Sequence, residues 1–326
     1  MIRILIGLGL ITIISCDSNI GIATDKTQND TYDTVQDSSE NDIELSEEED
    51  TGESEEPNEN NLITDFSEWG PHWPYGITTQ EYTVDVTNCL DMAYTVYTPY
   101  ADDPPTIVLG HGFARGPETM TGWAAHFSSW GFEVLLPKLC HYNIFSGVDH
   151  AMNGQNLTEL VSSHGATKVI YAGHSAGGLA SVIAASIDLN ALGVVGLDTT
   201  DTDGIPGVPD LLGQQYAGNM MSPGFLIMGE PSSCNAENNS LDLFRIMDGH
   251  HAIRVTEADH CDFENPTDWV CESQCEYQNL VYTDEEIKST IVLFATAATM
   301  SLADLSPDGI RTWEELTNKE IIQELE

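Results

Sequence analysis

The chain has 326 residues, of which 53 are acidic and 10 are Lys or Arg, giving a net charge of −43 at neutral pH. This charge argues against a nucleic acid partner, because phosphate contacts need Lys and Arg, and an anionic membrane surface would repel the chain. A hydrophobic fraction of 41% suffices for a packed core, so the chain is not disordered throughout.

The first residues are typical of an export signal. Arg3 precedes an apolar run over residues 4–14, which is too short to span a bilayer as a stable helix, and Cys16 follows. A run that ends in this way resembles a bacterial lipoprotein signal. We therefore expect a signal peptide over residues 1–16, a lipid on Cys16 and a protein anchored to the cell envelope. A cleaved signal without a lipid, giving a secreted protein, is the alternative.

Residues 17–65 contain 17 acidic residues and one Lys, and few apolar side chains. Such a segment cannot bury enough surface to offset its ordering entropy, so we expect an acidic disordered linker. From residue 66 the composition becomes globular, and we expect one folded domain over residues 66–326.

Within this domain, apolar β-rich runs alternate with helical ones. We expect an opening antiparallel pair over 81–89 and 93–100, and further strands over 105–111, 132–139, 168–173, 191–197, 224–228 and 251–256. Helices are expected over 119–130, 156–163, 177–187 and 284–302. The alternation predicts an α/β fold with a mostly parallel central sheet and helices on both faces, whose site lies beyond the carboxyl ends of the strands.

The strand over 168–173 runs into Gly173-His174-Ser175-Ala176-Gly177, and a helix follows. This is a G-x-S-x-G pattern in strand–turn–helix context, in which a sharp turn lifts the serine hydroxyl into the cleft. The pattern predicts Ser175 as a nucleophile, because a serine in this position can be activated by a nearby base. A glycine-rich helix start with a capping serine is the alternative.

The base should follow the serine in the chain, which leaves His250, His251 and His260. The first two lie where a helix enters a strand. His260 follows the last strand, where a loop can reach the cleft, and is our candidate base. For the acid, Asp198 directly follows the strand over 191–197, and we prefer it to Glu230 at the end of the next strand. Asp201 and Asp203 remain further alternatives.

Two backbone N–H groups are needed to bind an oxyanion. Ala176, the residue after the nucleophile, is one candidate. The other lies in the loop His111-Gly112-Phe113-Ala114-Arg115-Gly116 after the strand over 105–111, where we choose the N–H of Phe113, with Gly112 as the alternative.

These motifs resemble a group of α/β-hydrolases that comprises chlorophyllases, platelet-activating-factor acetylhydrolases and cutinase-type polyester hydrolases. The similarity covers roughly residues 80–300. His111-Gly112-Phe113, the elbow at Ser175, Gly196-Leu197-Asp198 and His260-Cys261-Asp262-Phe263 carry it, whereas Thr199 stands where chlorophyllases have proline. The resemblance implies an α/β-hydrolase fold and a serine esterase with a Ser175–His260–Asp198 triad, needing no metal or organic cofactor and acting on a small or polymeric ester. An amidase or acyltransferase with the same triad, or a non-catalytic surface lipoprotein, remains the alternative.

Besides Cys16 the chain has six cysteines, an even number that in an exported protein predicts three disulfides. A zinc site with Cys261, Cys271 and Cys275 is the rival interpretation. In the implied fold the loops carrying Cys234 and Cys261 share one edge of the sheet, so we expect a Cys234–Cys261 bridge. The acidic loop from Asp201 to Asp203 has part of the pattern of a calcium loop, but Thr199 stands where such a loop needs Asp.

Overall fold

The computed structural model describes residues 75–143, 147–203, 208–275, 280–305 and 308–325. The predicted signal peptide with Cys16, the predicted acidic linker and residues 66–74 lie outside this part of the chain. No helix of the described residues is long and apolar enough to cross a membrane.

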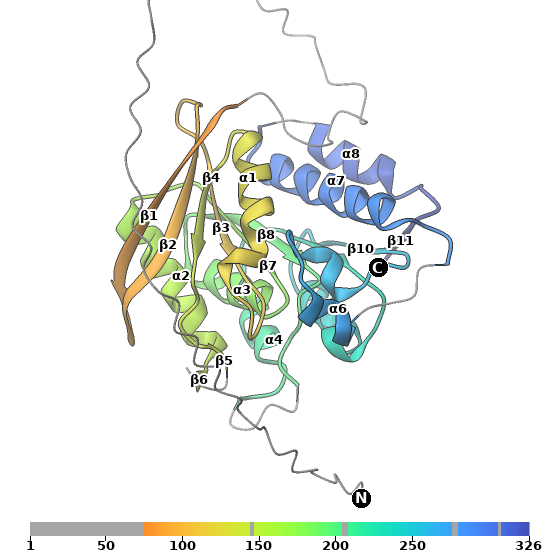
Figure 1. The fold of residues 1–326 in the computed structure, drawn as a ribbon, viewed down its shortest axis with the longest axis horizontal. Helices are drawn as coiled ribbons and strands as arrows, with labels where there is room; N and C mark the ends of the chain where they lie inside the picture. The colour runs from red at the N-terminus through yellow and green to blue at the C-terminus, as the bar shows by residue number, and fades with distance from the viewer. Residues whose placement is uncertain (1–74, 144–146, 204–207, 276–279, 306–307, 326) are drawn as a thin grey trace, which may run out of the picture. The chain divides into compact units, whose positions relative to one another are not determined.

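A nine-stranded sheet forms the centre of the fold (Figure 1). Its spatial order is β1-β2-β4-β3-β7-β8-β9-β10-β11. The strands are β1 (Ile77–Val86), β2 (Cys89–Pro99), β3 (Thr106–Gly110), β4 (Glu133–Pro137), β7 (Val169–His174), β8 (Ala191–Leu197), β9 (Gly224–Met228), β10 (His251–Val255) and β11 (Ile322–Glu324). A separate pair joins β5 (Tyr142–Asn143) to β6 (Gly147–Val148).

The sheet is mixed rather than uniformly parallel. The six strands from β4 to β10 in spatial order pair in parallel, whereas the pairs β1–β2, β2–β4 and β10–β11 are antiparallel. The opening antiparallel pair follows the sequence prediction. The closing antiparallel strand β11 was not expected, because a three-residue edge strand leaves little pattern in the sequence.

The helices are α1 (Thr121–Ser129), α2 (His150–His164), α3 (Ala176–Ile187), α4 (Leu212–Ala217), α5 (Ser240–Arg245), α6 (Trp269–Cys275), α7 (Asp284–Leu302) and α8 (Asp308–Leu316). Short 3₁₀ helices cover η2 (Pro117–Met120), η3 (Ser233–Asn238) and η4 (His260–Phe263). The predicted helix over 156–163 begins earlier, at His150, because the Asp149 side chain caps its first turn by accepting from Met152 N–H.

Successive residues of the central strands point to opposite faces and enter two separate cores. In β3, Ile107 and Leu109 pack with α1, α7 and α8, whereas Val108 packs with α2 and α3. Figure 1 shows these two helix layers on either side of the sheet. Both faces of the sheet are thus covered, which explains why its central strands are apolar throughout.

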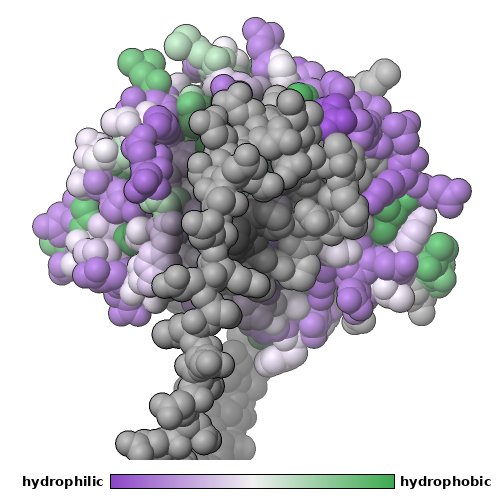
Figure 2. Space-filling view, turned by 90° about the horizontal axis from the view of Figure 1, so that it is seen from above, coloured by the Kyte–Doolittle hydropathy of each residue, from purple (hydrophilic) through white to green (hydrophobic). Residues whose placement is uncertain are grey.

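The outer surface has the opposite character. Figure 2 shows a face whose coloured residues are mostly hydrophilic, with apolar residues in small separate groups. This agrees with the excess of acidic residues in the composition.

Candidate active site

Ser175 lies in a sharp turn at the centre of the sheet. β7 ends at His174, α3 begins at Ala176, and Ser175 between them has φ 55° and ψ −124°. A positive φ is costly for a residue with a side chain, so the packing on both sides of the turn must hold it. The turn places the side chain at the wall of a pocket while the residue stays 7% exposed.

The glycines of the G-x-S-x-G pattern are explained by close backbone contacts. A Cβ on Gly173 would lie 2.5 Å from the carbonyl carbon of Gly177, and one on Gly177 would lie 2.5 Å from the carbonyl oxygen of His111. Any larger residue would push α3 away from β7 and β3. The glycines therefore set the close approach of helix and strand that the turn at Ser175 requires.

His260 and Asp198 are joined by a short hydrogen bond. The Nδ1 of His260 lies 2.6 Å from Oδ2 of Asp198, so the ring donates to the carboxylate. Asp198 follows the last residue of β8 and is fully buried, and His260 opens η4 just after β10. Strand ends from different parts of the chain thus bring the acid and the histidine together.

Asp198 is held by two further donors. Its Oδ1 accepts from the N–H of Gly229 at 3.0 Å, and its Oδ2 accepts from the side-chain amide of Asn235 at 3.1 Å. Asn235 is itself fully buried and also donates to the carbonyl of Glu230. No motif in the sequence marks Asn235, because it reaches the acid from η3, 37 residues further along the chain.

Glu230, the alternative acid, lies elsewhere. Its carboxylate accepts from the backbone N–H of Glu257 at 3.1 Å and so braces the start of the loop that carries His260. The other rejected candidates also have separate contacts. His250 donates to the carbonyl of Met247, and the ring of His251 stacks on Phe225.

The loop from Asp201 to Asp203 forms no metal site among the described residues. The carboxylate of Asp201 is buried and accepts from the N–H groups of Thr202, Gly213 and Gln214. It therefore caps the start of α4. Asp203 is exposed, and the carboxylate that accepts from His260 is that of Asp198.

Ser175 and His260 line a single pocket of about 300 Å³. The other lining residues come from the loop after β3, from the end of β7, from η3, from the loop after β10 and from α6; they are Gly112, Phe113, Ala114, Arg115, His174, Cys234, Glu264, Val270, Cys271, Gln274 and Cys275. Phe113 is 39% exposed at this wall.

The loop after β3 lies directly over the serine. A Cβ on Gly112 would lie 3.4 Å from Cβ of Ser175, so the backbone of Gly112 and Phe113 is close to the hydroxyl-bearing residue. Ala176 is the first residue of α3, where backbone N–H groups lack partners within the helix. Both expected oxyanion donors are therefore near Ser175.

The six described cysteines form three disulfides: Cys89–Cys140, Cys234–Cys275 and Cys261–Cys271. The expected Cys234–Cys261 pairing is wrong. Cys234 does lie near the histidine loop, but α6 stands between the two segments and supplies a different cysteine to each. Both ends of α6 are thereby tied to the pocket wall.

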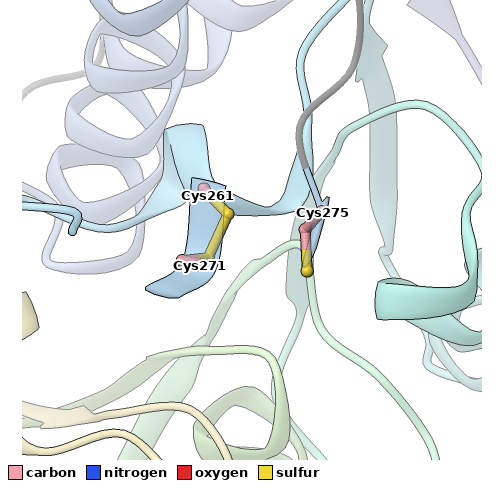
Figure 3. Close-up of side chains that lie close together, drawn as sticks. All are labelled: Cys261, Cys271 and Cys275. Atoms are coloured by element: carbon pink, nitrogen blue, oxygen red, sulfur yellow. A yellow bond between two sulfur atoms is a disulfide. The ribbon is translucent and has the colours of Figure 1, made fainter. Parts of the chain in front are cut away.

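The sulfurs of Cys261, Cys271 and Cys275 lie within 4.8 Å of one another, as a zinc site would require. Figure 3 shows that Cys261 and Cys271 are nevertheless joined to each other, with Cys275 beside them. Because all three sulfurs are in disulfides, they offer no thiolate to a metal.

A buried histidine, His174, also lines this pocket, and the sequence alone did not indicate its role. His174 Nε2 donates to the carbonyl of His260 at 2.9 Å, and its Nδ1 lies 3.8 Å from the carboxylate of Glu264. Burial, followed by the charge of His260, holds the pKa of His174 well below its usual range. The ring of His174 is therefore neutral and carries its proton on Nε2.

No protein-family model matches the chain, and no curated protein matches it.

Proposed function

We propose that this chain is a serine hydrolase of the α/β-hydrolase type that cleaves carboxylic esters. The observation that carries the proposal is the 2.6 Å hydrogen bond between His260 and Asp198, in a pocket that His260 shares with Ser175 on its strained turn. A buried carboxylate that orients a histidine beside a serine is the constellation of an activated nucleophile.

The order of these residues along the sheet supports the assignment to this fold. The serine follows the central strand β7, the acid follows the neighbouring β8, and the histidine follows β10. The chain order Ser, Asp, His, and a serine at a strand-to-helix turn, distinguish this fold from other folds that carry the same triad.

In the proposed reaction the hydroxyl of Ser175 attacks the ester carbonyl while Nε2 of His260 takes its proton. Asp198 holds the imidazole with Nε2 free to act as a base, and stabilises the imidazolium that forms. The N–H groups of Ala176 and Phe113 bind the oxyanion of the tetrahedral intermediate. His260 then gives the proton to the leaving alcohol, which leaves the acyl group on Ser175. A water molecule next attacks the acyl group while His260 takes its proton, and His260 returns that proton to Ser175 as the carboxylic acid is released.

This mechanism is tested by turnover on matched pairs of substrates, a set of activated esters of increasing acyl length and the corresponding anilides. Ser175→Ala should lower ester turnover by about 10³-fold or more. Ser186→Ala is the matched control, because its hydroxyl lies on the same helix but bonds only to the carbonyl of Ile183. Preference for the anilides would make the chain an amidase. Absence of turnover by the wild-type protein on every substrate would make it a non-catalytic protein.

We also propose that the protein is exported and anchored through a lipid on Cys16. Three disulfides in the described domain support export, because such bridges form and persist in oxidising compartments. Mass spectrometry of the mature protein should find a diacylglyceryl group on Cys16. A mature terminus that begins beyond Cys16 would instead indicate a secreted protein.

A further inference from the structure

Arg115 joins two loops that line the pocket. We call residues 111–116 the oxyanion loop and residues 257–268 the histidine loop. Nε and Nη2 of Arg115 each donate to one oxygen of Glu264 at 2.6 Å, which makes the pair bidentate. The two residues are 149 positions apart in the chain, so this contact fixes the separation of the loops directly.

The pair is shielded from water. The side chain of Glu264 is fully buried and that of Arg115 is 15% exposed. The carboxylate of Glu264 raises the pKa of Arg115 above its usual value. A shielded pair with this fork geometry is rigid, and removing one partner leaves the charge of the other buried without a counter-charge.

Glu264 also lies against the backbone support of His260. His174 donates from Nε2 to the carbonyl of His260, and the two rings have centroids 4.4 Å apart. The other nitrogen of His174 has no hydrogen-bond partner and faces Glu264 at 3.8 Å. A Cβ on Gly112 would lie 3.2 Å from that nitrogen, so the oxyanion loop also packs against the ring of His174.

The histidine loop has further contacts with η2 and α1. Gly122 N–H donates to the carbonyl of Asn265, Asn265 N–H donates to the carbonyl of Thr119, and the indole of Trp123 donates to the carbonyl of Phe263. These bonds hold the end of the histidine loop on α1. Arg115 joins this loop to the oxyanion loop through Glu264 and, at 3.0 Å, through the half-exposed Asp268.

We propose that Arg115 and Glu264 are positioning residues for the ester hydrolysis proposed above, on which this inference rests. The pair sets the oxyanion donors and His260 at a fixed separation across Ser175. Because the two charges of the pair balance each other, His174 also stays uncharged while its Nε2 donates to the carbonyl of His260. Neither side chain takes part in bond making.

The charge balance around His260 makes this role measurable. The charged and titratable groups that surround its ring or its loop include Asp198, His174, Glu264, Arg115, Asp268, Asp259, Asp262, Lys288, Glu257 and Glu230. Glu264→Gln leaves the cation of Arg115 without its buried partner. An added positive field disfavours the imidazolium, so the acid limb of the kcat/KM profile should move to lower pH.

The test is steady-state kinetics on one small activated ester, with active sites counted by a fluorophosphonate so that only folded enzyme enters kcat. Glu264→Gln should lower kcat by roughly 10- to 100-fold with KM changed less than about threefold, and should move the acid limb down by about 0.5 pH unit. Arg115→Lys keeps the charge but loses the fork. It should lower kcat by roughly tenfold and leave the acid limb in place.

Asp268→Asn is the matched control, since Asp268 is the second, half-exposed partner of Arg115 at 3.0 Å, and its amide form keeps the cap on α6. It should change kcat less than about twofold. Glu264→Gln with an unchanged kcat per active site and an unchanged acid limb would overturn the inference. If Glu264→Gln does not fold, an Arg115→Lys protein with wild-type kcat would overturn it equally. An inactive wild-type protein would instead refute the proposed function.

Discussion

The two halves of the candidate site are held in different ways. Ser175 and Asp198 follow adjacent parallel strands, β7 and β8, whose ladder fixes them to one another. His260 and Phe113 lie in loops, and side chains supply much of the support of these loops: the ion pairs of Arg115, two disulfides and the carboxylate of Glu257, which accepts from the N–H groups of Val281 and Tyr282.

The two halves of the site should therefore respond differently to single substitutions. A strand-borne residue is placed by many backbone hydrogen bonds, and single substitutions there change chemistry more than geometry. A loop-borne residue depends on a few side chains, and removing one of them shifts the loop. We therefore expect substitutions in the strand half to act on the chemical step, and substitutions that release the loop half to have graded effects on position.

The largest effect is expected for the acid in the strand half. Asp198→Asn should lower turnover by at least about 10²-fold, because the imidazole loses its orienting partner and the support of its positive charge. Glu230→Gln is the matched control at the next strand end and should cost less than about tenfold, since Glu230 bonds to Glu257 N–H and not to His260. Turnover on one activated ester, with folding checked by circular dichroism, decides the order. Reversed losses would make Glu230 the acid.

A smaller effect is expected when the loop half is released. The double variant Cys261→Ser and Cys271→Ser removes the bridge beside His260 and should lower kcat by about tenfold while the nucleophile stays in place. The Cys89–Cys140 bridge, which joins β2 to the segment after β4, is the comparison.

The two bridges should separate activity from stability. Cys89–Cys140 closes a loop of 51 residues against 10 for Cys261–Cys271, so its removal should cost about 4 kcal/mol of unfolding free energy against about 3 kcal/mol. Its effect on kcat should nevertheless stay below about twofold. Equal losses of kcat in the two double variants would show that the bridge beside His260 has no special part in placing the base.

The smallest effect on activity is expected at Asp262. A substitution there tests whether this residue makes the unfolding free energy depend on pH. Burial, followed by the charge of Asp259, raises the pKa of Asp262 to about 6. The folded protein therefore holds this proton more tightly than the unfolded chain. The resulting stabilisation is complete below about pH 4 and is lost as the pH rises through about 6.

Asp262→Asn keeps an oxygen that can accept from Asp259 N–H and removes the titration. Relative to wild type, the variant should gain up to about 3 kcal/mol of unfolding free energy between pH 4 and pH 7, with kcat changed less than about twofold. Urea unfolding at several pH values measures this, and Asp203→Asn, at an exposed position, serves as the control. A constant difference between the variant and wild type across this range would contradict the prediction.

The strand half of the site could be predicted from the sequence. Each of its residues directly follows an apolar run, and the carboxyl ends of parallel strands meet at one edge, so Ser175 and Asp198 were expected to be neighbours. His260 could be placed as well, because only a loop after β10 lets a late histidine reach that edge. The antiparallel β11 and the short helices α4, α5 and α6 could not be predicted, since their segments are too short to show a period.

The supports of the loop half could not be predicted either. Asn235, Arg115 and Glu264 act over separations of 37 to 149 residues, and no local pattern relates them to their partners. The cysteine pairing failed for the same reason. Expecting Cys234 beside Cys261 was correct about the region and wrong about the bond, because α6 brings Cys271 and Cys275 to the same place.

Labelling with a fluorophosphonate, followed by mapping of the adduct by mass spectrometry, shows whether Ser175 is an activated nucleophile. We predict one adduct per molecule, located on Ser175, with ester turnover lost in proportion to labelling and with labelling slowed by at least about 10²-fold in Asp198→Asn. A folded protein that turns over esters while Ser175 stays unlabelled, or that is labelled on another residue, would contradict the account.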